Sequence, residues 1–211
     1  MEAERFIDTY PRLYHMAHEN ALDGILRHGL LSTSALLDLF EVGNDQRRQI
    51  ENYMRRDSVP IEHKKYGRAV IRDQKPIGND SRLAGALGDS ATPTEWHRLL
   101  NSKVFFWVTE ERLQRLRKAR AYRHSRHLVL TLDTEKVVAA AGDCLWISSM
   151  NSGACMPFAH PRAPSIFQRL EHYDFDTLKK ARGVGNAIVE CAIDDRLFPI
   201  QPSLISARVV S

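Results

Sequence analysis

The carboxylate of Glu190 is a candidate for chemistry because it interrupts an apolar segment. The segment, 187–193, reads Ala-Ile-Val-Glu-Cys-Ala-Ile and is typical of a β-strand. On an alternating strand Glu190 would share a face with Ile188 and Ala192. A carboxylate there costs free energy unless it reaches solvent or lines a cleft. Two interpretations follow: an ordinary glutamate that faces outward, or a catalytic carboxylate.

Two histidines near the start of the chain form a second candidate site. His15 follows Tyr14 in a short, partly apolar segment, and His18 and Asn20 directly precede a helical pattern. A histidine at a strand end, beside the start of a helix, can hydrogen-bond a ribose hydroxyl or an amide. No third ligand stands at a recognisable spacing from His15 and His18, so we expect no metal. The alternative for His15 is a half-buried histidine with satisfied hydrogen bonds.

An aromatic segment, 103–107, reads Lys-Val-Phe-Phe-Trp and supplies rings that could line a site. Aromatic strands more often form core, so Phe105 and Phe106 are candidates for either role. Tyr122, which we expect at the end of the next helix, could stack on a flat ligand ring or close the helix end. Cys155 with His160 or His172 would suggest a thiol hydrolase. It lies in a Gly/Pro-rich stretch without a following helix, so we expect it to be structural.

Basic residues are concentrated in two stretches of this 211-residue chain, whose formal net charge is +4. From Arg112 to Arg126 there are seven Lys or Arg residues and no acidic residue, and a second basic stretch runs from Gln46 to Arg72. Such clusters attract the phosphates of nucleic acid or of a dinucleotide. The alternative is an ordinary solvated helix face.

The composition is that of a globular domain, with 43% hydrophobic and 27% charged residues. No apolar run approaches the roughly 20 residues that span a bilayer, and the N-terminal segment lacks the apolar part of a secretion signal. Three cysteines are too few for a disulfide framework. We therefore expect one domain over residues 1–211, cytoplasmic, with reduced thiols and no membrane partner.

The elements that must position these residues follow from hydrophobic periodicity and from helix-ending residues. Expected strands cover residues 13–17, 69–71, 104–108, 127–133, 144–148 and 187–193. Expected helices cover 20–30, with Gly29 near the end, 44–56, 94–100, and a segment that Thr109 begins and Tyr122 ends. Residues 73–93 and 150–164 are rich in Gly and Pro and are expected to be loops. Because helices and strands do not alternate regularly, the pattern favours an α+β fold.

Taken in order, these features resemble the ADP-ribosyltransferase superfamily and most closely the DarT-type toxins, which ADP-ribosylate DNA. Tyr14-His15, His18, Asn20 and the closing Gly29-Leu30 are similar to the opening strand–helix segment of those toxins, with one residue fewer between the second His and the Asn. Segments 104–107 and 189–191 resemble the next strand and the strand that carries the catalytic Glu. An uncharacterised bacterial family shares Ile71-Arg-Asp-Gln74, Leu100-Asn101, Val104-Phe-Phe-Trp107 and Asn151-Ser-Gly153.

The resemblance implies an α+β fold in which two small mixed or antiparallel sheets flank an NAD cleft, with peripheral helices. It implies that Glu190 stabilises an oxocarbenium-like transition state and orients or deprotonates the acceptor. An arginine would grip the pyrophosphate bidentately; Arg72 is favoured over Arg68 for this role. The residues expected to bind NAD besides this arginine are His15, Asn20, Phe105, Phe106, Tyr122 and Asn151. Phe105 or Phe106 stands where the superfamily often has Tyr, which removes a hydroxyl and keeps the ring.

The resemblance also implies release of nicotinamide and a nucleic acid acceptor, DNA or RNA, in agreement with the basic stretches. A toxin or phage-defence effector with an antitoxin partner is the biological role it implies. Ile188 stands where arginine-modifying toxins usually carry an acidic residue, which disfavours an arginine acceptor. The alternative function is a non-catalytic domain that binds nucleic acid or nucleotides.

Overall fold

A computed structural model describes residues 1–211 and has an α+β architecture. Six antiparallel strands form the main sheet in the order β10-β6-β1-β5-β8-β7, and two further sheets, β2–β9 and β3–β4, have two strands each. The strands are β1 (Arg12–His18), β2 (Leu30–Leu31), β3 (Val59–His63), β4 (Gly67–Ile71), β5 (Lys103–Trp107), β6 (His127–Asp133), β7 (Leu145–Ser148), β8 (Glu190–Asp194), β9 (Arg196–Leu197) and β10 (Leu204–Val210). The helices are α1 (Ala3–Thr9), α2 (Leu22–His28), α3 (Thr33–Leu39), α4 (Asn44–Asn52), α5 (Asp80–Leu87), α6 (Pro93–Asn101), α7 (Glu110–Lys118), α8 (Thr134–Ala141), α9 (Phe175–Arg182) and α10 (Val184–Ala187).

The main sheet consists of two three-stranded halves that meet at a single residue pair. Along β1 every residue pairs with β6, and along β5 every residue pairs with β8. Between β1 and β5, by contrast, only Tyr14 and Trp107 are paired. The resemblance implied two small sheets that flank a cleft. In the structure the Tyr14–Trp107 pair joins the two halves into one six-stranded sheet, and two short ribbons are added.

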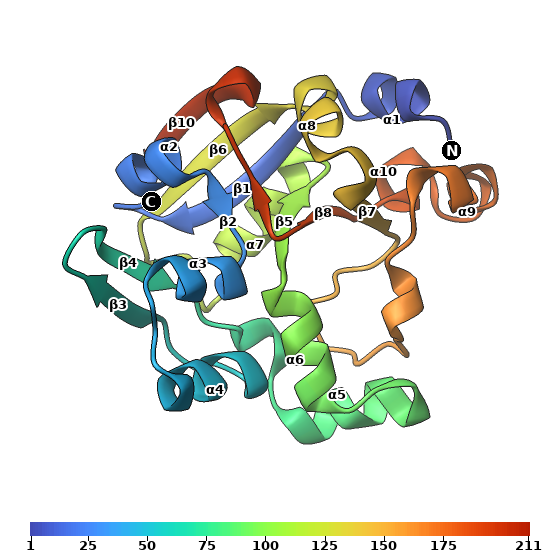
Figure 1. Cartoon of the computed structure of the whole chain (residues 1–211). Helices are drawn as coiled ribbons and strands as arrows, with labels where there is room; N and C mark the ends of the chain where they lie inside the picture. The colour runs from blue at the N-terminus through green and yellow to red at the C-terminus, as the bar shows by residue number, and fades with distance from the viewer.

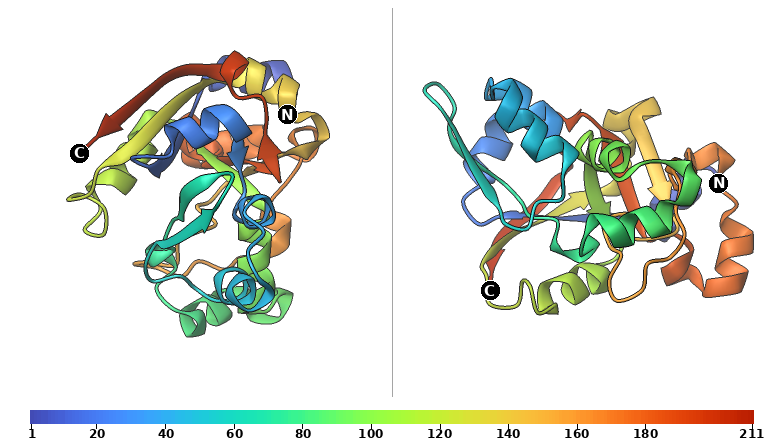
Figure 2. Two further views of the ribbon diagram at one scale, coloured as in Figure 1. Left: turned by 60° about the vertical axis from the view of Figure 1, so that its left-hand side comes forward. Right: turned by 90° about the horizontal axis from the view of Figure 1, so that it is seen from below.

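Three buried clusters hold the elements together. The largest packs α1, α2 and α8 against the sheet and includes Phe6, Leu130 and Val137. A second packs α5 against α6 around Trp96, and a third joins α3, α4 and the β3–β4 ribbon around Ile50. Figure 1 shows the main sheet in the upper half of the view and α4, α5 and α6 in the lower half. The β3–β4 ribbon projects from the body of the molecule in Figure 2.

The structure confirms all six predicted strands, with small shifts at their ends. It corrects the loop predicted at 73–93, because this segment contains α5. Asn79 caps that helix by accepting a hydrogen bond from the Arg82 backbone N–H at 2.8 Å, and Leu83 and Leu87 are buried.

Three predicted boundaries were also wrong. Helix α4 ends at Asn52, four residues early, and α7 ends at Lys118, because Ala119 is extended. The last strand begins only at Glu190, since α10 occupies residues up to Ala187. The Thr109 side chain makes no capping bond, although its position just before α7 is as predicted. None of the helices has the length and apolar character needed to cross a membrane.

Gly29 ends α2 in a conformation that other residues rarely adopt. Its φ is +83°, and a Cβ at this position would lie 2.5 Å from the Leu197 carbonyl oxygen. The close approach arises because Leu30, the next residue, pairs with Leu197 of β9. The absence of a side chain at position 29 therefore lets α2 lead directly into the β2–β9 ribbon.

Candidate active site

A cavity of about 600 Å³ lies where the two halves of the sheet separate, within the range of small-molecule sites. Strands β1 and β5, the end of α2, strand β4 and the 151–153 loop line it. All nine residues singled out from the sequence are among its lining residues: His15, Asn20, Arg68, Arg72, Phe105, Phe106, Tyr122, Asn151 and Glu190. The fold thus brings together residues that are up to 175 positions apart in the chain.

Glu190 is the first residue of β8 and is only 4% exposed. Its Oε1 accepts a hydrogen bond from the Ser152 backbone N–H at 3.1 Å. Burial raises the pKa of Glu190 to about 7, an effect that the Ser152 bonds and the charges of Arg162 and Arg112 partly offset. The outward-facing alternative is therefore excluded. A carboxyl group that titrates near neutrality can act as a general base there.

His15, on β1, also lines the cavity, and its Nδ1 is 2.8 Å from the Phe105 carbonyl oxygen of β5. A carbonyl oxygen can only accept, so Nδ1 carries a proton. Burial lowers the pKa of His15, and this favours the neutral ring. In the neutral ring Nε2 is an acceptor, able to receive a hydrogen bond from a hydroxyl group.

Arg72 follows β4 and makes no hydrogen bond through its guanidinium group, whose Nη1 is fully buried. The guanidinium lies 5.2 Å from the ring centre of Tyr122, and the Tyr122 hydroxyl donates to Asp73 at 2.7 Å. Burial lowers the pKa of Arg72, while Tyr122 and Asp73 partly oppose this effect. An arginine with free donors, supported by an aromatic ring, suits a phosphate ligand.

Tyr122 lies in a turn beyond the end of α7 and is buried. Burial, with the Asp73 bond second, raises the pKa of its hydroxyl. The structure therefore gives Tyr122 a supporting role beneath Arg72. Stacking on a ligand ring stays a prediction.

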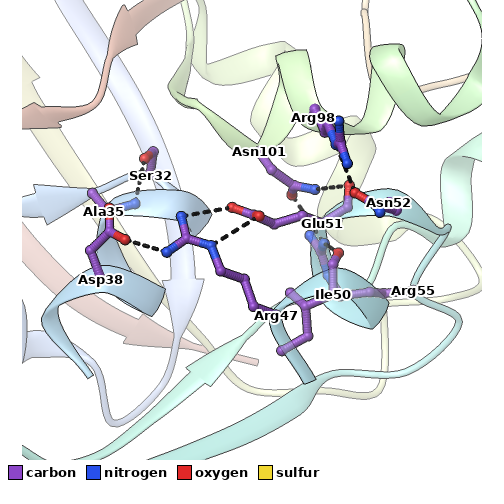
Figure 3. Close-up of polar contacts among 10 residues, drawn as sticks. All are labelled: Ser32, Ala35, Asp38, Arg47, Ile50, Glu51, Asn52, Arg55, Arg98 and Asn101. Atoms are coloured by element: carbon purple, nitrogen blue, oxygen red, sulfur yellow. Dashed lines mark hydrogen bonds and ion pairs between the residues drawn. The ribbon is translucent and has the colours of Figure 1, made fainter. Parts of the chain in front are cut away.

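Arg55, which sequence reasoning missed, fixes the chain at Arg72. Its Nε donates to the Arg72 carbonyl at 3.0 Å, and its Nη1 donates to the Ile50 carbonyl at 2.7 Å and to Asn101 Oδ1 at 3.0 Å. Asn101 in turn donates to the Glu51 carbonyl at 3.1 Å. Figure 3 shows the part of this network that joins Arg55, Asn101 and α4. The network holds the segment that carries Arg72 against helices α4 and α6.

The other predicted residues lie at different depths in the cavity. Asn20 and Arg68 are exposed at the rim, and Arg68 lies 3.9 Å from Glu62 in an exposed ion pair. Phe106 is 1% exposed and its ring centre is 5.8 Å from that of His15. Phe105 packs on Phe167 instead, with ring centres 6.1 Å apart. The aromatic strand thus belongs both to the core and to the cavity wall.

The 151–153 loop contributes backbone groups to the cavity, and Asn151 Oδ1 accepts from the Gly153 N–H at 3.1 Å. The sequence singled out Asn151 but missed Ser152, whose contribution is a backbone N–H that no sequence pattern reveals.

Cys155 is fully buried in the second cluster, away from the cavity, and burial raises the pKa of its thiol. This environment disfavours the thiol hydrolase alternative.

The arrangement joins a carboxyl group that titrates near neutrality, an imidazole acceptor and an unpaired guanidinium in one cavity. Residues 11–203, which include every lining residue, match a family of unknown function, DUF7002. The chain belongs to this family. No protein of curated function matches the chain.

Proposed function

We propose that this protein is an NAD-dependent ADP-ribosyltransferase that releases nicotinamide. The observation that carries the proposal is the convergence of Glu190, His15 and Arg72 on one cavity. The proposal includes the fold implied by the resemblance, in which NAD binds between two small sheets. The single-pair junction between β1 and β5 supports it, because the cavity lies beside that junction.

The free groups of the cavity fit the parts of a dinucleotide. The unpaired guanidinium of Arg72 would bind the pyrophosphate, and Nε2 of His15 would accept a hydrogen bond from a ribose hydroxyl. NAD supplies a ribose whose bond to nicotinamide breaks heterolytically, so that the electron pair leaves with nicotinamide. Glu190, when ionised, stabilises the positive charge that develops on the ribose. It then takes the proton that the acceptor loses as the new bond to the ribose forms.

The exposed basic residues at the end of α7 and just after it support a nucleic acid acceptor. Lys118, Arg120 and Arg123 are exposed and make no ion pair, and the same segment places Tyr122 in the cavity wall. Cationic side chains beside a cavity would hold a phosphate backbone close to Glu190. A nucleic acid that reacts should therefore bind less tightly as salt is raised.

The direct test is incubation of the protein with NAD labelled in its adenylate part, in separate mixtures with single-stranded DNA, duplex DNA, RNA and protein. We expect transfer of label to a nucleic acid together with release of an equal amount of nicotinamide. Glu190→Gln keeps an oxygen for the Ser152 N–H and should reduce both signals about a hundredfold or more. The matched control is Glu171→Gln, on the surface, which should leave both unchanged. The proposal fails if the unmodified protein neither transfers label nor releases nicotinamide.

A non-catalytic nucleic-acid-binding domain is the second candidate, and the basic segment after α7 favours it equally. The two candidates differ in the role of Glu190. A binding domain would bind nucleic acid with the same salt dependence in the Glu190→Gln variant and would release no nicotinamide.

The toxin role is tested by expression in bacteria. Arrest of growth by the unmodified protein, and not by Glu190→Ala, would support a toxic transferase and would justify a search for an antitoxin. Equal growth of the two strains would argue against this role.

A further inference from the structure

The loop between β7 and α9 contains a buried arginine that does not line the cavity. Arg162 is 4% exposed. Its Nη1 donates to the Ser152 carbonyl at 2.9 Å, and its Nη2 donates to the Ala154 carbonyl at 2.7 Å. One side chain therefore fixes the backbone on both sides of Gly153, which lines the cavity.

Ser152 connects this arginine to Glu190. The carbonyl of Ser152 accepts from Arg162, while its N–H donates to Glu190 Oε1 at 3.1 Å. Ser152 is the only residue that donates a hydrogen bond to the Glu190 carboxylate. The position of this donor therefore depends on the backbone that Arg162 holds.

The backbone of Arg162 is itself bonded to α5 and to Ser90, which follows that helix. Its backbone N–H donates to the Ala86 carbonyl at 2.9 Å, and its carbonyl accepts from Ser90 Oγ at 3.1 Å. A continuous series of hydrogen bonds thus runs from α5 through Arg162 and Ser152 to Glu190. Such a series can orient a carboxylate more narrowly than strand β8 alone, because it fixes the side chain as well as the backbone.

We propose that Arg162 is the positioning residue for Glu190, because it holds the Ser152 amide against the carboxylate and supplies a buried positive charge behind it. The catalytic consequence rests on the proposed function, while the positioning itself does not. Two arginines act on the charge of Glu190: Arg162 from the loop and Arg112 from α7. Arg112 bonds instead to the Gly185 carbonyl and to Asn186, so it does not hold Ser152.

Two variants separate the charge of Arg162 from its geometry. Arg162→Gln removes the charge, and Arg162→Lys keeps the charge but has one nitrogen where two donors are needed. The matched control is Arg169→Lys. Arg169 donates to the Leu145 carbonyl at 3.2 Å and lies over the Trp146 ring, so it has a similar structural role without a link to Glu190.

The first measurement is the titration of Glu190 by NMR of protein labelled with ¹³C at the glutamate carboxyl group. Arg162→Gln should raise the midpoint by about half a pH unit or more, because a charge that favours the carboxylate is lost. Arg162→Lys, which keeps the charge but loosens the Ser152 amide, should raise the midpoint less than Arg162→Gln does, and Arg169→Lys should leave it near that of the unmodified protein. An unchanged midpoint in folded Arg162→Gln would overturn the proposal.

The second measurement applies even if Arg162→Gln does not fold. Hydrogen exchange of the Ser152 amide should be about tenfold faster in Arg162→Lys and unchanged in Arg169→Lys. Release of nicotinamide should show kcat about tenfold lower in Arg162→Lys, with KM for NAD within about twofold. Unchanged exchange in Arg162→Lys would refute the positioning role. Absence of nicotinamide release in every protein would refute the transferase and leave the titration and the exchange rates to decide the role of Arg162.

Discussion

His15 on β1 and the carbonyl of Phe105 on β5 are joined by a hydrogen bond of 2.8 Å across the gap between the two halves of the sheet. The bond replaces the backbone pairing that ends at Tyr14 and Trp107. It also fixes the imidazole ring so that Nδ1 is committed to the protein and Nε2 is free for a ligand.

Substitution of His15 should separate these two functions. Asn places its amide nitrogen near the position of Nδ1 and has nothing at Nε2, so His15→Asn should keep the bond to Phe105 and lose the bond to ribose. We expect about tenfold weaker binding of NAD, the value of one hydrogen bond, with an unfolding temperature close to that of the unmodified protein. Calorimetric titration with NAD and thermal denaturation test this. His15→Ala is the control that should lose both affinity and stability, and unaltered NAD binding by His15→Asn would remove His15 from the site.

Arg72 and Arg68 are a natural pair for comparison, because they lie four residues apart and differ in environment. Arg72 has a buried guanidinium without hydrogen bonds, whereas Arg68 is exposed beside Glu62. Arg72→Lys should raise KM for NAD about tenfold or more, since an ammonium group cannot make the bidentate contact. Arg68→Lys should change KM by less than about twofold. Steady-state release of nicotinamide over a range of NAD concentrations gives both values, and equal effects would mean that the pyrophosphate does not bind at Arg72.

Six of the ten strands could be predicted from the sequence because their apolar residues form short uninterrupted runs, whereas β2, β3, β9 and β10 were not predicted. In β6, six of the seven residues are buried, which is what the run His-Leu-Val-Leu-Thr-Leu predicts. Helix α5 was missed because Gly85 lies within it and Gly78 and Gly88 lie beside it. Its stability comes from the Asn79 cap and from burial against α6, and neither is visible in a local window.

The site residues also divide into those that the sequence reveals and those that it does not. Glu190 and His15 could be found because a polar group in an apolar segment is unusual. Arg55 and Arg162 look like surface residues in the sequence, since Arg55 stands in a polar stretch and Arg162 in a Pro-rich one. They are buried because they bond to groups fixed by long-range folding, as with Arg55 and Asn101, 46 positions apart. Positioning residues of this kind are therefore found only from coordinates.

Gly29 should be intolerant of a side chain. Gly29→Ala combines a positive φ with a Cβ that would lie 2.5 Å from the Leu197 carbonyl oxygen, so we expect a loss of about 2 kcal/mol or more in the free energy of unfolding. Gly85→Ala is the matched control: Gly85 lies within α5 and a Cβ there meets nothing within 4 Å. That change should stabilise the protein by about 0.5–1 kcal/mol. Urea denaturation measures both, and a neutral Gly29→Ala would show that the chain after α2 can shift.

The buried carboxylate of Glu190 should make the protein less stable as pH rises. The pKa of Glu190 is about 7 in the folded protein, against 4.5 as the reference value. Between these values the folded state binds more protons than the unfolded state, so the free energy of unfolding falls with increasing pH. The contribution of the Glu190 carboxyl group to the free energy of unfolding is fully present below pH 4.5 and is lost once the pH has risen through 7. The whole change amounts to about 3 kcal/mol, from 1.36 kcal/mol per pKa unit.

Glu190→Gln tests this directly, because the amide is neutral at every pH and keeps an acceptor for the Ser152 N–H. At pH 8 the variant should be more stable than the unmodified protein by about 2–3 kcal/mol, or roughly 5 °C in unfolding temperature for a chain of this length. At pH 4.5 the difference should almost vanish, since Glu190 is then protonated in the folded protein. Glu171→Gln, exposed on the surface, controls for the loss of a negative charge. A Glu190→Gln variant that is less stable than the unmodified protein at pH 8 would mean that the carboxylate has partners that compensate for its burial, and that its ionisation is not held near neutrality.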